Sequence, residues 1–155
     1  MNTRHIYYFS RLNYIFLFLL LRTCFMSITC AQEIVVKDIP SLEKLPVKAI
    51  HRIFQDSDGY IWYGTFNGLC RDDGYDVRVF RSDLFHYGLL KDNYITYINE
   101  DHEKHIWFGT FKGAYMLDKA TYRITPVNME ELSDKNVFSI NVTKDGTIWV
   151  SVAGA

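Results

Sequence analysis

Hydrophobic and polar positions alternate in short runs along most of the chain. Residues 60–65 read YIWYGT, and residues 47–55 are rich in β-branched and aromatic side chains. Each run is followed by turn residues, Asp56-Ser57-Asp58-Gly59 in one case and Phe66-Asn67-Gly68 in the other. This pattern predicts short antiparallel strands joined as hairpins, and no helical periodicity follows residue 31. We expect four strands at 47–55, 60–65, 69–71 and 75–80, and four more at roughly 93–100, 105–110, 114–117 and 122–127.

The eight strands follow from a repeat that is marked by three tryptophans. Trp62, Trp107 and Trp149 are spaced 45 and 42 residues apart. Aligned on them, residues 50–68 and 95–113 match without a gap and are identical at nine of nineteen positions. The third segment keeps Val137, Ile140, Gly146, Ile148 and Trp149. The identical pairs are Ile50/Ile95, Ile53/Ile98, Asp56/Asp101, Ile61/Ile106, Trp62/Trp107, Gly64/Gly109, Thr65/Thr110, Phe66/Phe111 and Gly68/Gly113.

Four short antiparallel strands in each period of 40–45 residues are typical of a β-propeller blade. Tandem sandwiches need about 100 residues per domain, and a solenoid β-helix uses shorter turns, so both fit less well. We therefore predict an all-β fold, a propeller fragment of about two and a half blades. Because a propeller closes with four to eight blades, the chain is expected to be part of a longer propeller. The expected segments are an outer closing strand at 33–39, blades at 47–81 and 93–127, and a truncated blade at 136–155.

The repeated residues are interpreted as packing residues. Large flat side chains at one position per blade fill the space between neighbouring sheets, which assigns the three tryptophans to the blade interfaces. A side chain at Gly64 or Gly109 would clash where the sheets approach each other closely. The full set of structural motif residues is Trp62, Gly64, Thr65, Gly68, Trp107, Gly109, Thr110, Gly113 and Trp149.

The first 31 residues resemble a secretory signal. A basic start with Arg4 and Arg11 precedes the apolar run YIFLFLLL at 14–21, and small residues follow up to Ala31. We expect cleavage before Gln32 and an exported, periplasmic protein. Arg22 interrupts the apolar run, which weakens the alternative of an uncleaved membrane anchor more than it weakens a signal peptide. A lipoprotein signal through Cys30 fits poorly, because Thr29 stands where a smaller residue is expected.

Composition and charge leave few other chemistries open. The chain is 48% hydrophobic and 16% aromatic with a net charge of −1, so no nucleic-acid contact is expected. Cys70 is interpreted as a small buried hydrophobic residue. The Asp56–Gly59 turn resembles the start of a calcium loop but has Asn67 in place of the twelfth-position glutamate. His102 and His105 lack the spacing of a helical zinc pair. We predict no metal, no cofactor and no catalytic group.

Residues 50–83 and 95–127 resemble two-component regulator propeller repeats. The hallmark is an acidic turn, Ile-Trp, an aliphatic or aromatic residue, Gly-Thr, two residues and Gly, and it occurs twice. Lys104 replaces the turn glycine, and Cys70-Arg71-Asp72 replaces the usual Asn-Arg-Tyr. The resemblance implies a periplasmic sensor of glycan-derived oligosaccharides in a hybrid two-component system. Its expected partners are further blades, a membrane-linked histidine kinase of the parent protein, and a second copy of the parent in a homodimer.

A ligand of such a propeller is expected on the face that carries the loops between strands two and three and between blades. The candidate contacts are Phe66, Asn67, Asn93, Phe111 and Lys112. Aromatic faces beside amide and cationic donors suit a sugar ring, although packing of the two phenylalanines between blades explains them equally well. The alternative function is a propeller lyase or another carbohydrate-active enzyme. It would need acidic or histidine side chains at the start of the inner strands, which read Val47-Lys48, Asn93-Tyr94 and Asn136-Val137.

Overall fold

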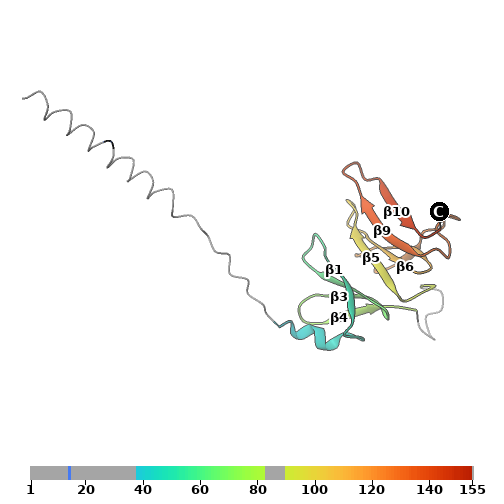
Figure 1. Ribbon diagram of the computed structural model, residues 1–155. Helices are drawn as coiled ribbons and strands as arrows, with labels where there is room; N and C mark the ends of the chain where they lie inside the picture. The colour runs from blue at the N-terminus through green and yellow to red at the C-terminus, as the bar shows by residue number, and fades with distance from the viewer. Residues whose placement is uncertain (1–13, 15–37, 83–89, 155) are drawn as a thin grey trace, which may run out of the picture. The chain divides into compact units, whose positions relative to one another are not determined.

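Figure 1 shows the computed structural model of the chain, which describes Tyr14, residues 38–82 and residues 90–154. The chain divides into two compact units, Met1–Lys37 and Asp38–Ala155. The fold below is that of the second unit. The predicted signal segment at 1–31 lies outside the described residues, Tyr14 excepted. Among the described residues, no helix has the length and hydrophobicity that crossing a bilayer requires.

Ten strands form three antiparallel sheets in the described part of the second unit. Two sheets have four strands, in the orders β1-β2-β3-β4 and β5-β6-β7-β8, and β9 pairs with β10. We call these sheets blades 1, 2 and 3. The predicted all-β propeller fragment is confirmed. The strands are β1 (Ile50–Gln55), β2 (Ile61–Thr65), β3 (Gly68–Asp72), β4 (Val77–Phe80), β5 (Ile95–Glu100), β6 (Ile106–Thr110), β7 (Gly113–Leu117), β8 (Ile124–Pro126), β9 (Val137–Val142) and β10 (Ile148–Val152).

The three blades share one strand register. Trp62 pairs with Phe54, Trp107 with Asn99 and Trp149 with Asn141, at the same place of the first hairpin. A residue with positive φ ends each of these hairpin turns: Gly59 (91°), Lys104 (67°) and Gly146 (85°). Lys104 thus adopts the backbone conformation for which the repeat uses glycine, so its substitution for glycine leaves the turn geometry unchanged.

Hydrophobic clusters join each blade to the next one. Trp62, Leu69 and Phe80 of blade 1 pack in one cluster with Ile95, Ile106 and other residues of blade 2. Trp107 packs in the cluster that joins Ala114 of blade 2 to Val137 and Ile140 of blade 3. Figure 1 shows the sheets in this succession, green, then yellow, then orange-red. Because side chains alternate along a strand, Trp107 packs toward blade 3 whereas its neighbours Ile106 and Phe108 pack toward blade 1.

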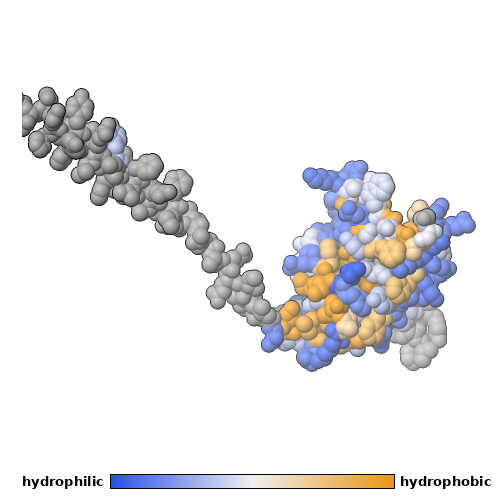
Figure 2. Space-filling model, viewed as in Figure 1, coloured by the Kyte–Doolittle hydropathy of each residue, from blue (hydrophilic) through white to orange (hydrophobic). Residues whose placement is uncertain are grey.

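Blade 1 carries a further cluster on the face that does not contain Trp62. Tyr63 and Cys70 are buried there together with Leu45. Leu45 follows η1 (Pro40–Lys44), a 3-10 turn with proline in its first positions, as expected from the fixed φ of proline. Ser41 of η1 donates a hydrogen bond to the Asp72 carboxylate and so ties this turn to β3. Figure 2 shows hydrophobic residues at the surface over η1 and β1.

Most of the outer strand predicted at 33–39 lies outside the described residues. A strand was expected at 33–39, but residues 33–37 lie outside the described residues and Asp38 and Ile39 belong to no strand. A helical turn, which the polar and apolar pattern did not predict, begins instead at Pro40.

Candidate functional site

In blades 1 and 2 the tryptophan is hydrogen-bonded to the acidic turn before it. Trp62 Nε1 donates to Asp56 Oδ2 over 2.9 Å, and Trp107 Nε1 donates to Asp101 Oδ2 over 2.7 Å. The second oxygen of each aspartate accepts two backbone N–H groups of the turn. Thr143 stands at this position in the third repeat. The sequence analysis assigned the aspartates to turn chemistry and missed the indole contact, although the constant six-residue spacing was visible.

The Gly-Thr-x-x-Gly part of the repeat forms the turn between the second and third strands. Thr65 Oγ1 donates to the carbonyl of Gly68 over 2.9 Å and accepts the backbone N–H of Asn67. Thr110 makes the same two bonds to the Gly113 carbonyl and the Lys112 N–H. Gly68 and Gly113 have φ of 112° and 122°. These residues therefore build the turn that presents Phe66 and Phe111.

Gly64 and Gly109 lie where neighbouring inner strands approach. A Cβ at Gly64 would lie 3.1 Å from Ile95 Cγ2 of β5, and one at Gly109 would lie 2.5 Å from Val137 Cγ1 of β9. Hydrogen bonds from side chains to backbone carbonyls join the inner strands. Arg52 Nε of β1 donates to the Thr96 carbonyl of β5, and Asn99 Nδ2 of β5 donates to the Ile140 carbonyl of β9. The inner strands β1, β5 and β9 are thus held close together.

An aromatic column runs along one end of these inner strands. His51 stacks on Tyr94 with ring centroids 4.6 Å apart, and Tyr94 stacks on Phe111 at 4.3 Å. Phe66 lies 6.5 Å from His51 in a tilted arrangement. Phe66 and Phe111 remain 48% and 43% exposed. The two phenylalanines that the sequence analysis selected therefore belong to one aromatic surface that spans blades 1 and 2.

A pocket of about 180 Å³ opens beside this column, and we call it the aromatic pocket. Three of its residues carry a buried polar atom without a hydrogen-bond partner: His51 Nε2, Thr96 Oγ1 and Asn136 Oδ1. Such atoms are rare because each has lost its water without gaining a bond. These atoms are enclosed by the side chains around them, so a ligand group would have to displace those side chains to bond to them. The pocket is lined by His51, Arg52, Tyr94, Ile95, Thr96, Phe111, Asn136 and Phe138, which come from all three blades.

The other candidate ligand contacts lie outside the aromatic pocket. The Asn93 carboxamide accepts from the backbone N–H of Ser82 and donates to its carbonyl, and the Asn93 carbonyl accepts from Gly68 N–H. Asn93 therefore ties the segment before β5 to Ser82 and to the start of β3. Lys112 is exposed and lines a different pocket of about 240 Å³, which also contains Lys91 and Tyr115. Asn67 is half-buried and supplies the turn N–H described above.

Of the eight residues that line the aromatic pocket, only Phe111 belonged to the predicted site. The seven that did not are His51, Arg52, Tyr94, Ile95, Thr96, Asn136 and Phe138. Tyr94 and Asn136 are at the inner-strand starts that the sequence analysis compared, so their position carried a signal. His51 and Thr96 occupy the same repeat position, one residue after Ile50 and Ile95. The alignment of the repeats shows that these two positions are equivalent. That both residues line one pocket depends on how the blades pack against each other.

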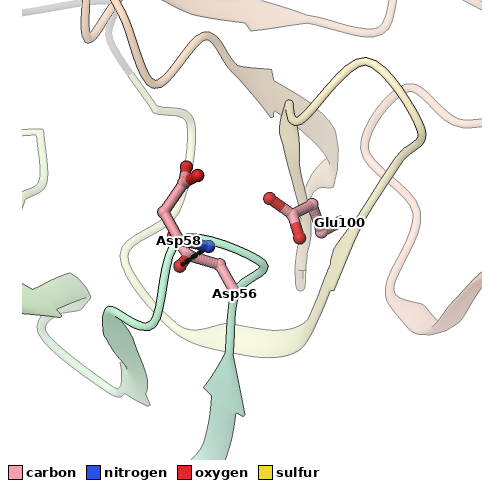
Figure 3. Close-up of side chains that lie close together, drawn as sticks. All are labelled: Asp56, Asp58 and Glu100. Carbon is pink, nitrogen blue, oxygen red and sulfur yellow. Dashed lines mark hydrogen bonds between the residues drawn. The ribbon is translucent and has the colours of Figure 1, made fainter.

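At the acidic turns, three carboxylates converge, as Figure 3 shows. Glu100 of β5 faces Asp56 and Asp58, and oxygens of the three lie within 4.8 Å of one another. The Lys119 ammonium lies among them and donates to Asp58 Oδ2 (2.6 Å), to Asp56 Oδ2 (3.3 Å) and to Glu100. The Lys119 ammonium thus serves as the counter-ion of this carboxylate cluster. The cluster joins blade 1, which carries Asp56 and Asp58, to blade 2, which carries Glu100 and Lys119.

The charges of this cluster shift the pKa values of Asp58 and Lys119. Hydrogen bonds from Lys104 and then Lys119 hold the pKa of Asp58 at about 2. Burial by itself lowers the pKa of Lys119, but its hydrogen bonds to Asp58, Glu100 and Asp56 outweigh burial and raise it. Lys119 therefore stays protonated at every physiological pH.

The remaining candidates have structural partners. His102 Nε2 contacts the Thr143 carbonyl at 2.9 Å, whereas His105 Nδ1 contacts Asp101 Oδ2 at 3.0 Å. The two histidines thus have separate partners, one in blade 3 and one in their own turn. Cys70 is buried, and this burial raises the pKa of its thiol to about 12. A thiol in that state is a packing residue rather than a nucleophile.

The three sheets, each built on a tryptophan hairpin and packed on the next, are blades of a β-propeller. Residues 44–67 and 89–112 match the family model of the two component regulator propeller. The chain thus carries two segments that match the repeat of this family. No curated protein matches the chain.

Solved structures show the same fold. The extracellular domain of a putative one component system from B. thetaiotaomicron is 27% identical with a TM-score of 0.54 over 64% of this chain. The extracellular domain of a putative hybrid two component system from the same organism is 24% identical with a TM-score of 0.55 over 76% of this chain. This chain spans 14% of the length of each of those chains.

Proposed function

We propose that this chain is part of the ligand-sensing propeller of an extracytoplasmic sensor and that the aromatic pocket binds a glycan-derived oligosaccharide. The observation that carries the proposal is the aromatic pocket itself. Stacked rings of His51, Tyr94 and Phe111 stand beside buried polar atoms that have no partner. Sugar rings have apolar C–H faces and polar edges, so they need these two surfaces side by side.

The size and origin of the pocket support a small ligand group. A pocket of about 180 Å³ suits one sugar ring rather than a whole oligosaccharide. The exposed faces of Phe66 and Phe138 continue the apolar surface around it and offer contacts to adjoining sugars. Because blades 1, 2 and 3 all contribute residues, ligand binding there would stabilise one arrangement of the three blades, which is what a sensor needs.

The wider role follows from the family and its neighbours. Two component regulators couple a sensor to a regulatory output, and both solved neighbours are described as extracellular domains of putative signalling systems. By analogy we propose a periplasmic location, a membrane-linked histidine kinase elsewhere in a longer parent protein, and a homodimeric parent that controls transcription. The neighbours are regulatory proteins, which favours the sensor over the alternative of a propeller lyase.

Ligand titration of the full-length protein against a panel of oligosaccharides tests the proposal. Tyr94→Ala and Phe111→Ala should each weaken binding of the responding sugar by about tenfold or more, the effect of removing a central aromatic contact. Tyr75→Ala is the matched control, because Tyr75 is 85% exposed and lies outside the aromatic pocket. It should bind like the wild type.

Thermal melting of each variant separates binding from folding. Unchanged affinity in both Tyr94→Ala and Phe111→Ala, with unchanged melting, would place the site elsewhere. Failure of every oligosaccharide to bind the wild type would remove glycan sensing from the proposal.

A further inference from the structure

The aromatic pocket carries an unbalanced positive charge. Arg52 lines the pocket, and none of the eight described lining residues is an aspartate or glutamate. Arg52 donates hydrogen bonds to two backbone carbonyls, from Nε to Thr96 over 2.7 Å and from NH1 to His51 over 2.8 Å. Carbonyl oxygens fix the direction of the guanidinium but leave its charge without a counter-ion.

In the other pockets of the described residues, most of the lining cations form ion pairs with carboxylates. Arg71 lies 3.6 Å from an Asp73 oxygen, and Lys91 lies 3.3 Å from Asp134. Lys119 contacts three carboxylates. Arg52 forms no ion pair among the described residues, and its pocket differs from the pocket of about 240 Å³, which contains the likewise unpaired Lys112, in having no acidic residue in its lining.

Two of the unpartnered atoms could donate hydrogen bonds close to this charge. Thr96 is 8% exposed and its hydroxyl can donate to an acceptor. His51 Nε2 can carry a hydrogen in one tautomer. Both residues also supply the carbonyls that hold Arg52, so the cation and the two donors belong to one connected group. Asn136 Oδ1 is an acceptor that suits a sugar hydroxyl.

We propose that the sugar in the aromatic pocket is acidic and that Arg52 recognises its carboxylate. A hexuronate fits this set, because its ring stacks on an aromatic face while its carboxylate accepts charge-assisted hydrogen bonds from a guanidinium. The inference rests on the proposed function, since it names the class of oligosaccharide that the same pocket would bind.

The test compares each acidic oligosaccharide with its own carboxyl-reduced form, which keeps the ring and loses the charge. Isothermal titration of the full-length protein with hexuronate oligosaccharides should show a preference of about tenfold or more for the acidic form. Arg52→Gln should reduce the ratio of the two affinities to near one. Lys48→Gln is the control, because Lys48 is an exposed lysine paired with Glu43 away from the pocket and should leave the ratio unchanged.

The affinity ratio remains informative even where Arg52→Gln loosens the packing of β1 on β5. Partial unfolding lowers binding of both ligands equally, whereas loss of charge recognition lowers only binding of the acidic form. Arg52→Lys keeps the charge and should retain part of the preference.

Two failures can be told apart. Equal or tighter binding of the carboxyl-reduced form by the wild type would overturn the acidic-ligand inference and leave oligosaccharide sensing in place. Failure of both forms and of every neutral oligosaccharide to bind would overturn the proposed function and this inference with it.

Discussion

Trp62 and Trp149 occupy the same position of the repeat and pair with the same position of the preceding strand, yet their surroundings differ. Trp62 is fully buried and its Nε1 donates to Asp56. Trp149 is 65% exposed, and Thr143 stands where the aspartate would be. The difference comes from what lies beyond each blade, because blade 2 covers Trp62 and no described residues cover the corresponding face of blade 3.

The comparison teaches that the motif prepares a side chain for burial but does not bury it. A strand directs the indole to one face of its own sheet. Burial, and with it most of the hydrophobic free energy, requires the face of another sheet. The same sequence pattern therefore contributes differently to the free energy of unfolding in blades 1 and 3. Substitutions at equivalent positions of the two blades should reveal this difference.

The largest effect is expected at the tryptophans. Trp62→Ala should lower the free energy of unfolding by about 3–5 kcal/mol, because it removes a fully buried ring and leaves a cavity between blades 1 and 2. Within residues 1–155 alone, where no described residue covers Trp149, Trp149→Ala should change that free energy by less than about 0.5 kcal/mol, as for other exposed positions. Urea denaturation of the two variants measures both values. Equal losses would contradict the dependence on a covering blade.

A smaller effect is expected at the glycine two residues after the tryptophan. Gly109→Ala should cost about 1–3 kcal/mol, because the added Cβ would meet Val137 Cγ1 of blade 3 at 2.5 Å. Ser151 occupies the equivalent position of the third repeat and is exposed. Ser151→Ala should change the free energy of unfolding by at most about 0.5 kcal/mol. Thermal melting compares the pair, and a stable Gly109→Ala variant would show that the blades can separate without cost.

The smallest effect is expected at Asp101, whose counterpart in the third repeat is Thr143. Partial burial by itself raises the pKa of Asp101, but hydrogen bonds from Trp107 and from the backbone and ring of His105 outweigh it and bring the pKa below its ordinary 3.8. A carboxyl with a lowered pKa in the folded state stabilises the fold above pH 3.8. This stabilisation is lost as the pH falls through the folded pKa.

Asp101→Asn should accordingly lower the free energy of unfolding at neutral pH by about 1 kcal/mol, since the amide keeps an acceptor but loses the charge. The variant should also flatten the acid dependence of stability below pH 3.8. Equilibrium unfolding at several pH values, followed by tryptophan fluorescence, measures both quantities. An acid dependence identical to that of the wild type would show that Asp101 gains nothing from its charge.

Much of the fold could be predicted because each repeat contains its own local rules. The alternation around Trp62 and Trp107 and the turn residues after each strand define hairpins without reference to distant residues. The strand at 33–39 stays a prediction, because residues 33–37 lie outside the described residues and an outer strand depends on a partner strand that pairs with it.

The candidate site was predicted only in part. Phe66 and Phe111 were identified because they recur at exposed turns, and the structure brings them to the same aromatic column. Asn93 was selected for its amide, but the backbone of Ser82 engages that amide. A polar side chain in a sequence does not reveal whether its hydrogen bonds are made within the protein, since these partners are distant in the chain.

The sequence by itself determined the blade, its strands, its turn chemistry and the family of the repeat, because these depend on residues within about 45 positions of one another. Tertiary structure alone decided which tryptophan is buried, that Lys119 contacts three carboxylates, and that Arg52, Tyr94 and Asn136 surround one pocket. The physical reason is that burial and charge pairing are properties of the contact between blades. Each blade supplies one surface of that contact, and the pocket exists only where three such surfaces meet.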